Sequence, residues 1–212
     1  YKLGMDEQIL PLITSANIAC GFHASDPVVM SRTVKMAAES GVATGAHPGY
    51  QDLVGFGRRN MKVAPAEVTD IVMYQIGALK AFCRANGIAM QHVKPHGAMY
   101  NMAEKDDKLA EAICRGIKAV NPDLILLGPG SGKMVKAAKA LGLKTAGEVF
   151  ADRAYMEDGT LVPRSQEGAM ITDEEEAVAR VLEMVQKGTV TAITGKKIEV
   201  QADSICVHGD GQ

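Results

Sequence analysis

The sequence has little of what nucleic-acid or membrane proteins need. Its 212 residues include no tryptophan, only 4% aromatic residues, and a net charge of −2. Proteins that bind single-stranded nucleic acid interleave basic and aromatic side chains, so this composition excludes that class. No apolar run approaches the roughly 20 residues of a membrane span. The first residues, YKLG, lack the basic-then-apolar layout of a signal peptide. We therefore expect neither nucleic acid nor membrane as a partner.

Cysteine is also scarce, and no two cysteines form a C-x-x-C pair. This spacing gives no sign of a redox motif or a disulfide framework. We expect free, buried thiols in a cytoplasmic protein. The cysteines are Cys20, Cys83, Cys114 and Cys206.

Two ligand-binding motifs are absent as well. The glycine-rich turn 128–133 is similar to a phosphate-binding loop, but Leu127 stands in place of the first glycine and Met134 in place of Ser or Thr. This excludes a Walker A loop and leaves weak anion binding by the turn's backbone open. No H-E-x-x-H motif occurs, so a zinc site would have to be assembled from separate strands.

Helix and strand patterns alternate along the whole chain. Helices are expected from an N-cap and proline at Asp26-Pro27 to Gly41, from Pro65 to Gly87, and over 109–120, 132–141 and 172–185. The last of these has a capping box of Thr172 with Glu175 and an apolar stripe through Val178, Val181, Leu182 and Val185. Strands are expected at 15–20, 43–46, 90–94, 123–127, 144–149 and 203–207, with a hairpin over 190–200.

This alternation with short connections predicts the α/β class, with a parallel sheet covered by helices in a barrel or an open doubly wound arrangement. No linker or repeat divides the chain, so we expect a single domain over 1–212. Two long irregular stretches, 48–62 and 152–171, have the length of functional loops.

All the histidines lie in short segments where a predicted apolar strand ends and a loop begins. They are His23, His47, His92, His96 and His208. Imidazole titrates near neutral pH and ligates metals. The carboxyl ends of strands are where ligands bind in α/β folds. This distribution predicts a reaction centre at that edge of the sheet.

The segment 92–97, HVKPHG, is the most specific candidate. Alternation along a strand points His92, Lys94 and His96 to one face. Lys94 could hold an anionic substrate group, and His96 could transfer protons. The alternative is that the first two are half-exposed edge residues.

Further candidates lie at other strand ends. His23 and His47 each sit beside small residues that let a ligand approach, although a lone histidine is more often a hydrogen-bonded core residue. Glu148 and Asp152 are acid/base or ligand candidates. Arg153 could grip a carboxylate or form an internal salt bridge. At the end of the last strand, Asp210 could orient His208.

These residues resemble the family of 5-oxoprolinase A subunits, also called the LamB/YcsF-type proteins. The matching stretches are YKLG, SANIACGFHASDP, GAHPGYQDLVGFGRR, HVKPHGAMYN, EVFADRAY, DGTLVPR, GAMI and SICVHGD. The resemblance implies a distorted (β/α) TIM-like barrel of the glycoside hydrolase/deacetylase type. It also implies an N-A-D-x-G-E strand ahead of Tyr1 and a helix beyond Gln212, so terminal elements are expected to be missing from this chain.

The resemblance further implies cytoplasmic, ATP-dependent opening of 5-oxoproline to L-glutamate together with subunits B and C. In that reaction Lys94 and Arg58 or Arg59 would neutralise phosphoryl charge. His47, His96, Asp152 and His208 are the candidates for catalysis, and the expected substrate-binding residues are His23, Arg58, Arg59, Glu148 and Arg153. Asp and Glu side chains would hold any Mg²⁺.

Two other functions stay open. Three histidines with a carboxylate would suit zinc, which favours a metal-dependent deacetylase- or amidase-like hydrolase of a small amide or carbohydrate. The chain could also be a non-catalytic, substrate-binding subunit. The residues alone support an α/β hydrolase-like enzyme for a small anionic substrate.

Overall fold

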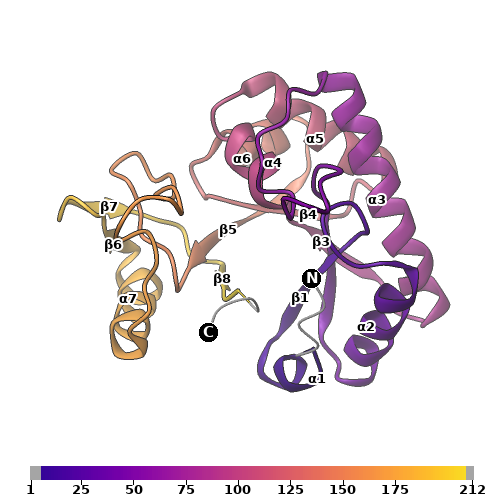
Figure 1. Cartoon of the computed structure of the whole chain (residues 1–212), viewed down its shortest axis with the longest axis horizontal. Coiled ribbons are helices and arrows are strands. Elements are labelled where there is room, and N and C mark those ends of the chain that lie inside the picture. Colours follow the sequence, from indigo (N-terminus) through magenta and orange to yellow (C-terminus); the bar gives the residue numbers. More distant parts are fainter. Residues whose placement is uncertain (1–5, 209–212) are drawn as a thin grey trace.

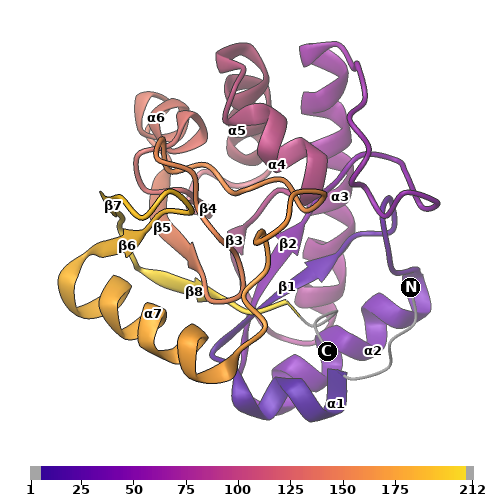
Figure 2. The same ribbon diagram turned by 60° about the vertical axis from the view of Figure 1, so that its left-hand side comes forward.

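A curled parallel sheet forms the centre of the computed structural model, which describes residues 6–208. The YKLG stretch and Asp210 lie outside the described residues. The sheet has six strands in the order β1-β2-β3-β4-β5-β8. The curled, open sheet and its helices confirm the predicted α/β class and barrel-like fold (Figures 1 and 2). The strands are β1 (Ser15–Ala19), β2 (Ala43–His47), β3 (Met90–Val93), β4 (Ile125–Gly128), β5 (Lys144–Phe150) and β8 (Ser204–Cys206).

Helices cover the outer face of this sheet in the row α2, α3, α5, α6 (Figure 2). Helix α2 begins at its predicted cap, where the Asp26 carboxylate accepts hydrogen bonds from the first backbone N–H groups, and Asp106 does the same for α5 without having been predicted. The helices are α1 (Asp6–Ile9), η1 (Leu10–Leu12), α2 (Pro27–Glu39), α3 (Pro65–Ala85), α4 (Gly97–Ala103), α5 (Asp107–Val120), α6 (Lys133–Ala140) and α7 (Glu174–Lys187).

The core lies between this helical row and the sheet. Val72 and Ile76 of α3, Ile113 of α5 and Leu126 of β4 are completely buried. Burying each such side chain stabilises the fold by roughly 1.5–3 kcal/mol. This layer holds the strands in register, and therefore fixes the positions of the residues at their carboxyl ends.

The segment between β5 and β8 projects from the rest of the molecule (Figure 1). It contains the irregular stretch 152–171, helix α7, and the antiparallel pair β6 (Thr189–Thr191) and β7 (Lys197–Glu199). The predicted hairpin over 190–200 is therefore confirmed. Across residues 6–208, no helix combines the length and apolar character needed to span a bilayer.

Two local expectations were wrong, and one helix was not predicted. Helix α4 occupies residues for which no element was predicted, and Gly97, with a left-handed φ of 53°, turns the chain into it. Helix α7 is capped by Asp173 and not by Thr172. Most of its predicted apolar stripe faces solvent, with Val178, Leu182 and Val185 at 59%, 50% and 53% exposure, whereas Val181 is partly buried against the core.

Candidate functional site

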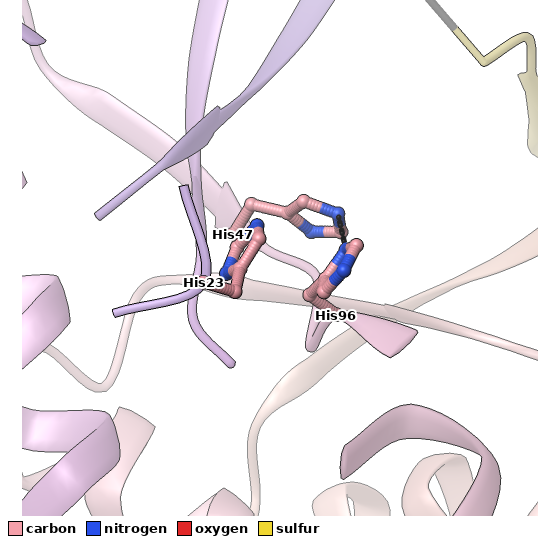
Figure 3. Close-up of side chains that lie close together, drawn as sticks. All are labelled: His23, His47 and His96. Atoms are coloured by element: carbon pink, nitrogen blue, oxygen red, sulfur yellow. Dashed lines mark hydrogen bonds between the residues drawn. The ribbon is translucent and has the colours of Figure 1, made fainter. Parts of the chain in front are cut away.

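Three histidines from separate strand ends meet at the carboxyl edge of the sheet (Figure 3). His47 ends β2, His23 follows β1, and His96 precedes α4. Each offers one ring nitrogen, and these nitrogens all lie within 4.8 Å of one another. We call these residues the histidine triad. The predicted convergence at one edge holds for these three imidazoles.

Parallel pairing explains the convergence. Ala19 of β1 is the register partner of His47, and Ala46 of β2 is the partner of Val93 in β3. Three neighbouring strands therefore end at the same level, and the first residues beyond them share one edge.

The triad rings are held in fixed orientations. The His23 and His96 rings stack, with centroids 3.8 Å apart and planes 5° from parallel. His47 stands at 82° to His96. Nδ1 of His47 lies 2.6 Å from the Lys94 carbonyl oxygen, and Nε2 of His96 lies 2.7 Å from the Phe56 carbonyl oxygen. Backbone carbonyls thus position two of the three rings.

Burial keeps these imidazoles neutral at physiological pH. The pKa of His23 is lowered to about 3 and that of His96 to about 4, chiefly by burial, and the positive charge of Arg58 contributes to both shifts. Burial and the neighbouring imidazoles hold the pKa of His47 well below its ordinary value. The triad is therefore a set of free bases near pH 7.

A buried ion pair joins the end of β3 to β5 and β8 at the same edge of the sheet. The Lys94 ammonium is 2.7 Å from the Glu148 carboxylate and 3.0 Å from the Cys206 sulfur. Burial alone would lower the pKa of Lys94, but the charge of Glu148 raises it above the ordinary value. The second Glu148 oxygen, Oε2, is buried without a hydrogen-bond partner among the described residues. It is a free acceptor inside an otherwise paired group.

Asp152 and His208 form a second imidazole–carboxylate contact. Nδ1 of His208 is 2.8 Å from the Asp152 carboxylate, and its ring stacks on Phe150. Burial alone would raise the pKa of Asp152, but the hydrogen bond to His208 lowers it below its ordinary value. The partner of His208 among the described residues is thus Asp152. The predicted role of Asp210 lies outside these residues and stays a prediction.

The loop 48–62 closes over the triad. Its Phe56 has a φ of 55° and its Gly57 a φ of 64°. The Arg58 guanidinium lies 4.9 Å above the Phe56 ring. The exposed Arg59 pairs with the buried Asp52, with Nε 3.0 Å from Oδ1. Arg58 therefore brings positive charge close to the triad, while Arg59 ties the loop to itself.

Two other basic residues serve local structure. Arg153 is buried and donates hydrogen bonds to the carbonyls of Ala169 and Val162, across the loop 152–171. His92 lies outside the triad: Nε2 contacts Asn17 Oδ1 at 3.1 Å and Nδ1 contacts the Gln91 side chain at 3.2 Å. It is a buried, hydrogen-bonded strand residue.

The backbone of the glycine-rich turn before α6 binds a carboxylate of the same chain. The backbone N–H groups of Lys133 and Met134 donate to the Glu104 carboxylate at 2.7 and 3.3 Å. The anion-binding capacity that the sequence left open is thus used by the chain's own side chain.

Two contributors to the site had no signal in the sequence. Cys206 contacts Lys94, and the Phe56 carbonyl orients His96. Strand pairing across the sheet positions Cys206, and a left-handed turn positions the Phe56 carbonyl.

Surface hollows lie beside α1 and α2, at Glu7 and Leu10, and along α7, at Val178, apart from these groups.

Comparison with known proteins identifies the family. The profile of the LamB/YcsF family matches residues 1–212. The chain is 65% identical to a 5-oxoprolinase A subunit of Clostridium beijerinckii, over 100% of this chain and 83% of the relative. It is 56% identical to the 5-oxoprolinase A subunit of Bacillus subtilis, over 100% and 82%.

A solved structure agrees. The lactam utilization protein from Thermus thermophilus superposes with a TM-score of 0.91 at 48% identity, covering 96% of this chain and 82% of that one. The chain belongs to the LamB/YcsF family. The Clostridium and Bacillus relatives are each named as the A subunit of 5-oxoprolinase, a name that describes those proteins as parts of a multi-subunit complex.

Proposed function

We propose that this protein is one component of an ATP-dependent 5-oxoprolinase, which opens 5-oxoproline to L-glutamate together with subunits B and C. The relatives named as 5-oxoprolinase A subunits support the substrate and the assembly. The observation that carries the proposal is the meeting of neutral imidazoles, a buried ammonium–carboxylate pair and Arg58 at one edge of the sheet. We place the reaction in the cytoplasm, where ATP is available and free thiols persist.

The chemistry requires activation of a stable amide. Transfer of the γ-phosphoryl group of ATP to the lactam oxygen releases ADP and creates a good leaving group. Water then adds to the same carbon, and the C–N bond breaks as the nitrogen takes up a proton, which leaves glutamate as its γ-acyl phosphate. A second water hydrolyses this acyl phosphate and releases glutamate and inorganic phosphate. Three tasks fall to side chains: proton removal from water, proton delivery to nitrogen, and stabilisation of phosphoryl charge.

The residues can be assigned to these tasks. Arg58 is exposed beside the triad and would neutralise phosphoryl or carboxylate charge. The free-base triad would accept the proton of water, and the His208–Asp152 pair would return a proton to nitrogen. Glu148 Oε2, buried and unpartnered among the described residues, would accept the lactam N–H, with Lys94 holding the carboxylate in place. Asp152 is the carboxylate of this edge that could receive the Mg²⁺ of ATP.

Reconstitution tests this proposal. The protein is combined with subunits B and C, and ADP and glutamate are measured with 5-oxoproline. We expect equimolar products, and a loss of at least about 100-fold in kcat for His96→Gln or for Lys94→Met. His92→Gln is the matched control, because it removes a buried histidine of the same sheet that lies outside the triad.

Two results would overturn the proposal. One is full activity in the His96→Gln, Lys94→Met double variant. The other is a complete three-subunit mixture that makes no glutamate from 5-oxoproline and ATP. A purely substrate-binding role would instead raise KM in these variants and leave kcat unchanged.

A metal-dependent amidase is the second candidate, favoured by the three converging imidazoles. It predicts hydrolysis of a small amide or acetylated sugar by the protein alone, without ATP. Measuring amide hydrolysis with and without ATP separates the two functions.

A further inference from the structure

The hydrogen bonds of the triad fix which ring nitrogens carry hydrogen. A carbonyl oxygen can only accept a hydrogen bond. Nδ1 of His47 therefore donates to the Lys94 carbonyl, and Nε2 of His96 donates to the Phe56 carbonyl. In neutral imidazoles this leaves lone pairs on Nε2 of His47 and on Nδ1 of His96. These two nitrogens are 3.0 Å apart and point at each other (Figure 3).

Two facing lone pairs repel unless something positive lies between them. A proton there would make an imidazolium, buried near the charges of Lys94 and Arg58, which both act on His96. A third ring nitrogen is close by: Nδ1 of His23 is buried and has no hydrogen-bond partner among the described residues. In the resting protein the site thus gathers two unprotonated imidazole nitrogens and a third without a partner.

We propose that His47 Nε2, His96 Nδ1 and one ring nitrogen of His23 bind a single divalent transition-metal ion, with Zn²⁺ as the best-matched ion. Zn–N bonds of about 2.1 Å at a tetrahedral angle place two ligand nitrogens about 3.4 Å apart. The observed 3.0 Å between His47 and His96 is within a small ring movement of that spacing. The His23 ring, which stacks on His96, would have to rotate out of the stack to direct a ring nitrogen at the same ion.

Two further features match a metal site. Histidine ligands usually donate their second ring N–H to a carbonyl or carboxylate, and the Lys94 and Phe56 carbonyls occupy those positions. The three ligands are all imidazoles, which suit Zn²⁺, whereas Mg²⁺ requires oxygen ligands. Three protein ligands leave a fourth position open, as in catalytic rather than structural zinc sites.

The ion would extend the function of the same site. With the ion bound, the triad nitrogens are ligands and not bases, and the ion would take over their task by lowering the pKa of a water at its open position; this use rests on the proposed function. Metal binding itself depends only on the triad and is tested without catalysis.

The test is metal titration of the purified, chelator-treated protein. Calorimetry is expected to show one Zn²⁺ per chain and no heat from Mg²⁺. Co²⁺ should give the intense visible bands of four-coordinate cobalt. His47→Gln and His96→Gln should each weaken Zn²⁺ binding at least about 100-fold, while the matched control His92→Gln should bind as the wild type does.

Other outcomes would overturn the inference. It falls if Zn²⁺ binds equally to His47→Gln and His96→Gln, or if the wild type binds no Zn²⁺. It also falls if ring ¹⁵N shifts at pH 7 show an imidazolium bridging His47 and His96. The cobalt spectrum and the ring shifts use the wild type, so a misfolded variant leaves the test intact. Tight Zn²⁺ binding without ATP-coupled ring opening would reject the proposed function alone, and the reverse result would reject the metal alone.

Discussion

At the scale of single residues, Gly57 sets the distance between the loop 48–62 and the triad. A β-carbon at this position would lie 2.7 Å from the β-carbon of His23 and 2.9 Å from Cδ2 of His96. Its φ of 64° is also one that side chains rarely adopt. The lack of a side chain therefore allows Phe56 to reach His96 with its carbonyl.

Gly57→Ala is expected to lower both stability and activity. Strain at positive φ and displacement of the histidine rings should together reduce the free energy of unfolding by roughly 2–4 kcal/mol. Zn²⁺ affinity and glutamate formation should fall further than the stability loss explains, because two triad rings must move. Denaturant unfolding and zinc titration measure the two effects.

Gly41→Ala is the matched control. Gly41 has nearly the same φ, 67°, but no atom lies within 4 Å of the added β-carbon. It should lose only about 1 kcal/mol to backbone strain and keep zinc affinity. Equal effects of the two substitutions would show that backbone strain, and not contact with the histidines, determines the behaviour of Gly57.

The Lys94–Glu148 pair makes a second prediction at this scale. Both side chains are nearly fully buried, at 6% and 1% exposure. Removing one partner leaves a buried charge, so Lys94→Met or Glu148→Leu should each destabilise the protein by about 3–5 kcal/mol. The double variant should be more stable than either single variant, because it removes both charges together. Urea unfolding of all four proteins gives the coupling energy.

If the stability losses of the two single variants simply add in the double variant, this account of the pair is wrong. Lys196 and Glu157 provide the comparison, since they form an ion pair at 3.1 Å with 63% and 47% exposure. The same cycle there should give less than about 1 kcal/mol, because solvent screens exposed charges.

At the scale of elements, helix α7 tests the corrected position of its cap. The Asp173 carboxylate accepts a hydrogen bond from the Glu176 N–H at 2.8 Å. Asp173→Ala should therefore cost about 1 kcal/mol of stability. Thr172→Ala should change stability by less than about 0.5 kcal/mol, as is usual for an exposed residue without a cap role. A larger loss for Thr172→Ala would restore the capping box that the sequence suggested.

The sequence predicted most elements because their ends are chemically marked. Asp26-Pro27 begins α2 and Pro65 begins α3, as expected from N-cap and first-turn preferences. Helix α4 escaped prediction because its seven residues follow a strand directly and depend on Gly97 at positive φ. The exposure of α7 depends on the placement of the projecting segment, which periodicity does not contain.

The site was predictable in location but not in its pairings. The predicted strand ends indicated that His23, His47 and His96 lie close together, because parallel strands bring their carboxyl ends to one edge. Sequence spacing could not reveal that Asp152 meets His208 or that Lys94 meets Cys206, since these contacts join residues 56 and 112 positions apart. Such pairs depend on strand order and register.

At the scale of the whole molecule, the buried histidines couple folding to protonation. The pKa values of His92 and His96 are lowered to about 4 and that of His23 to about 3, chiefly by burial. In the unfolded chain these groups return to an ordinary value near 6.5. Between about pH 6.5 and pH 4 the unfolded state therefore binds protons that the folded state does not.

Stability should consequently fall on acidification through this window and level off above about pH 7. Each such histidine contributes a slope of about 1.4 kcal/mol per pH unit once the unfolded state is fully protonated. Several acting together should unfold the protein well above pH 4.

Urea unfolding at pH 7.5, 6.5 and 5.5, with a chelator present to remove metal, measures the slope. His92→Gln should lower this slope by the contribution of about one proton. The His92 ring titrates independently of the triad, because it faces Asn17 and Gln91 and lies near Lys94. A stability that stays constant from pH 7.5 to 5.5 would mean that the rings accept protons in the folded state, and so are not the free bases that both metal binding and proton removal from water require.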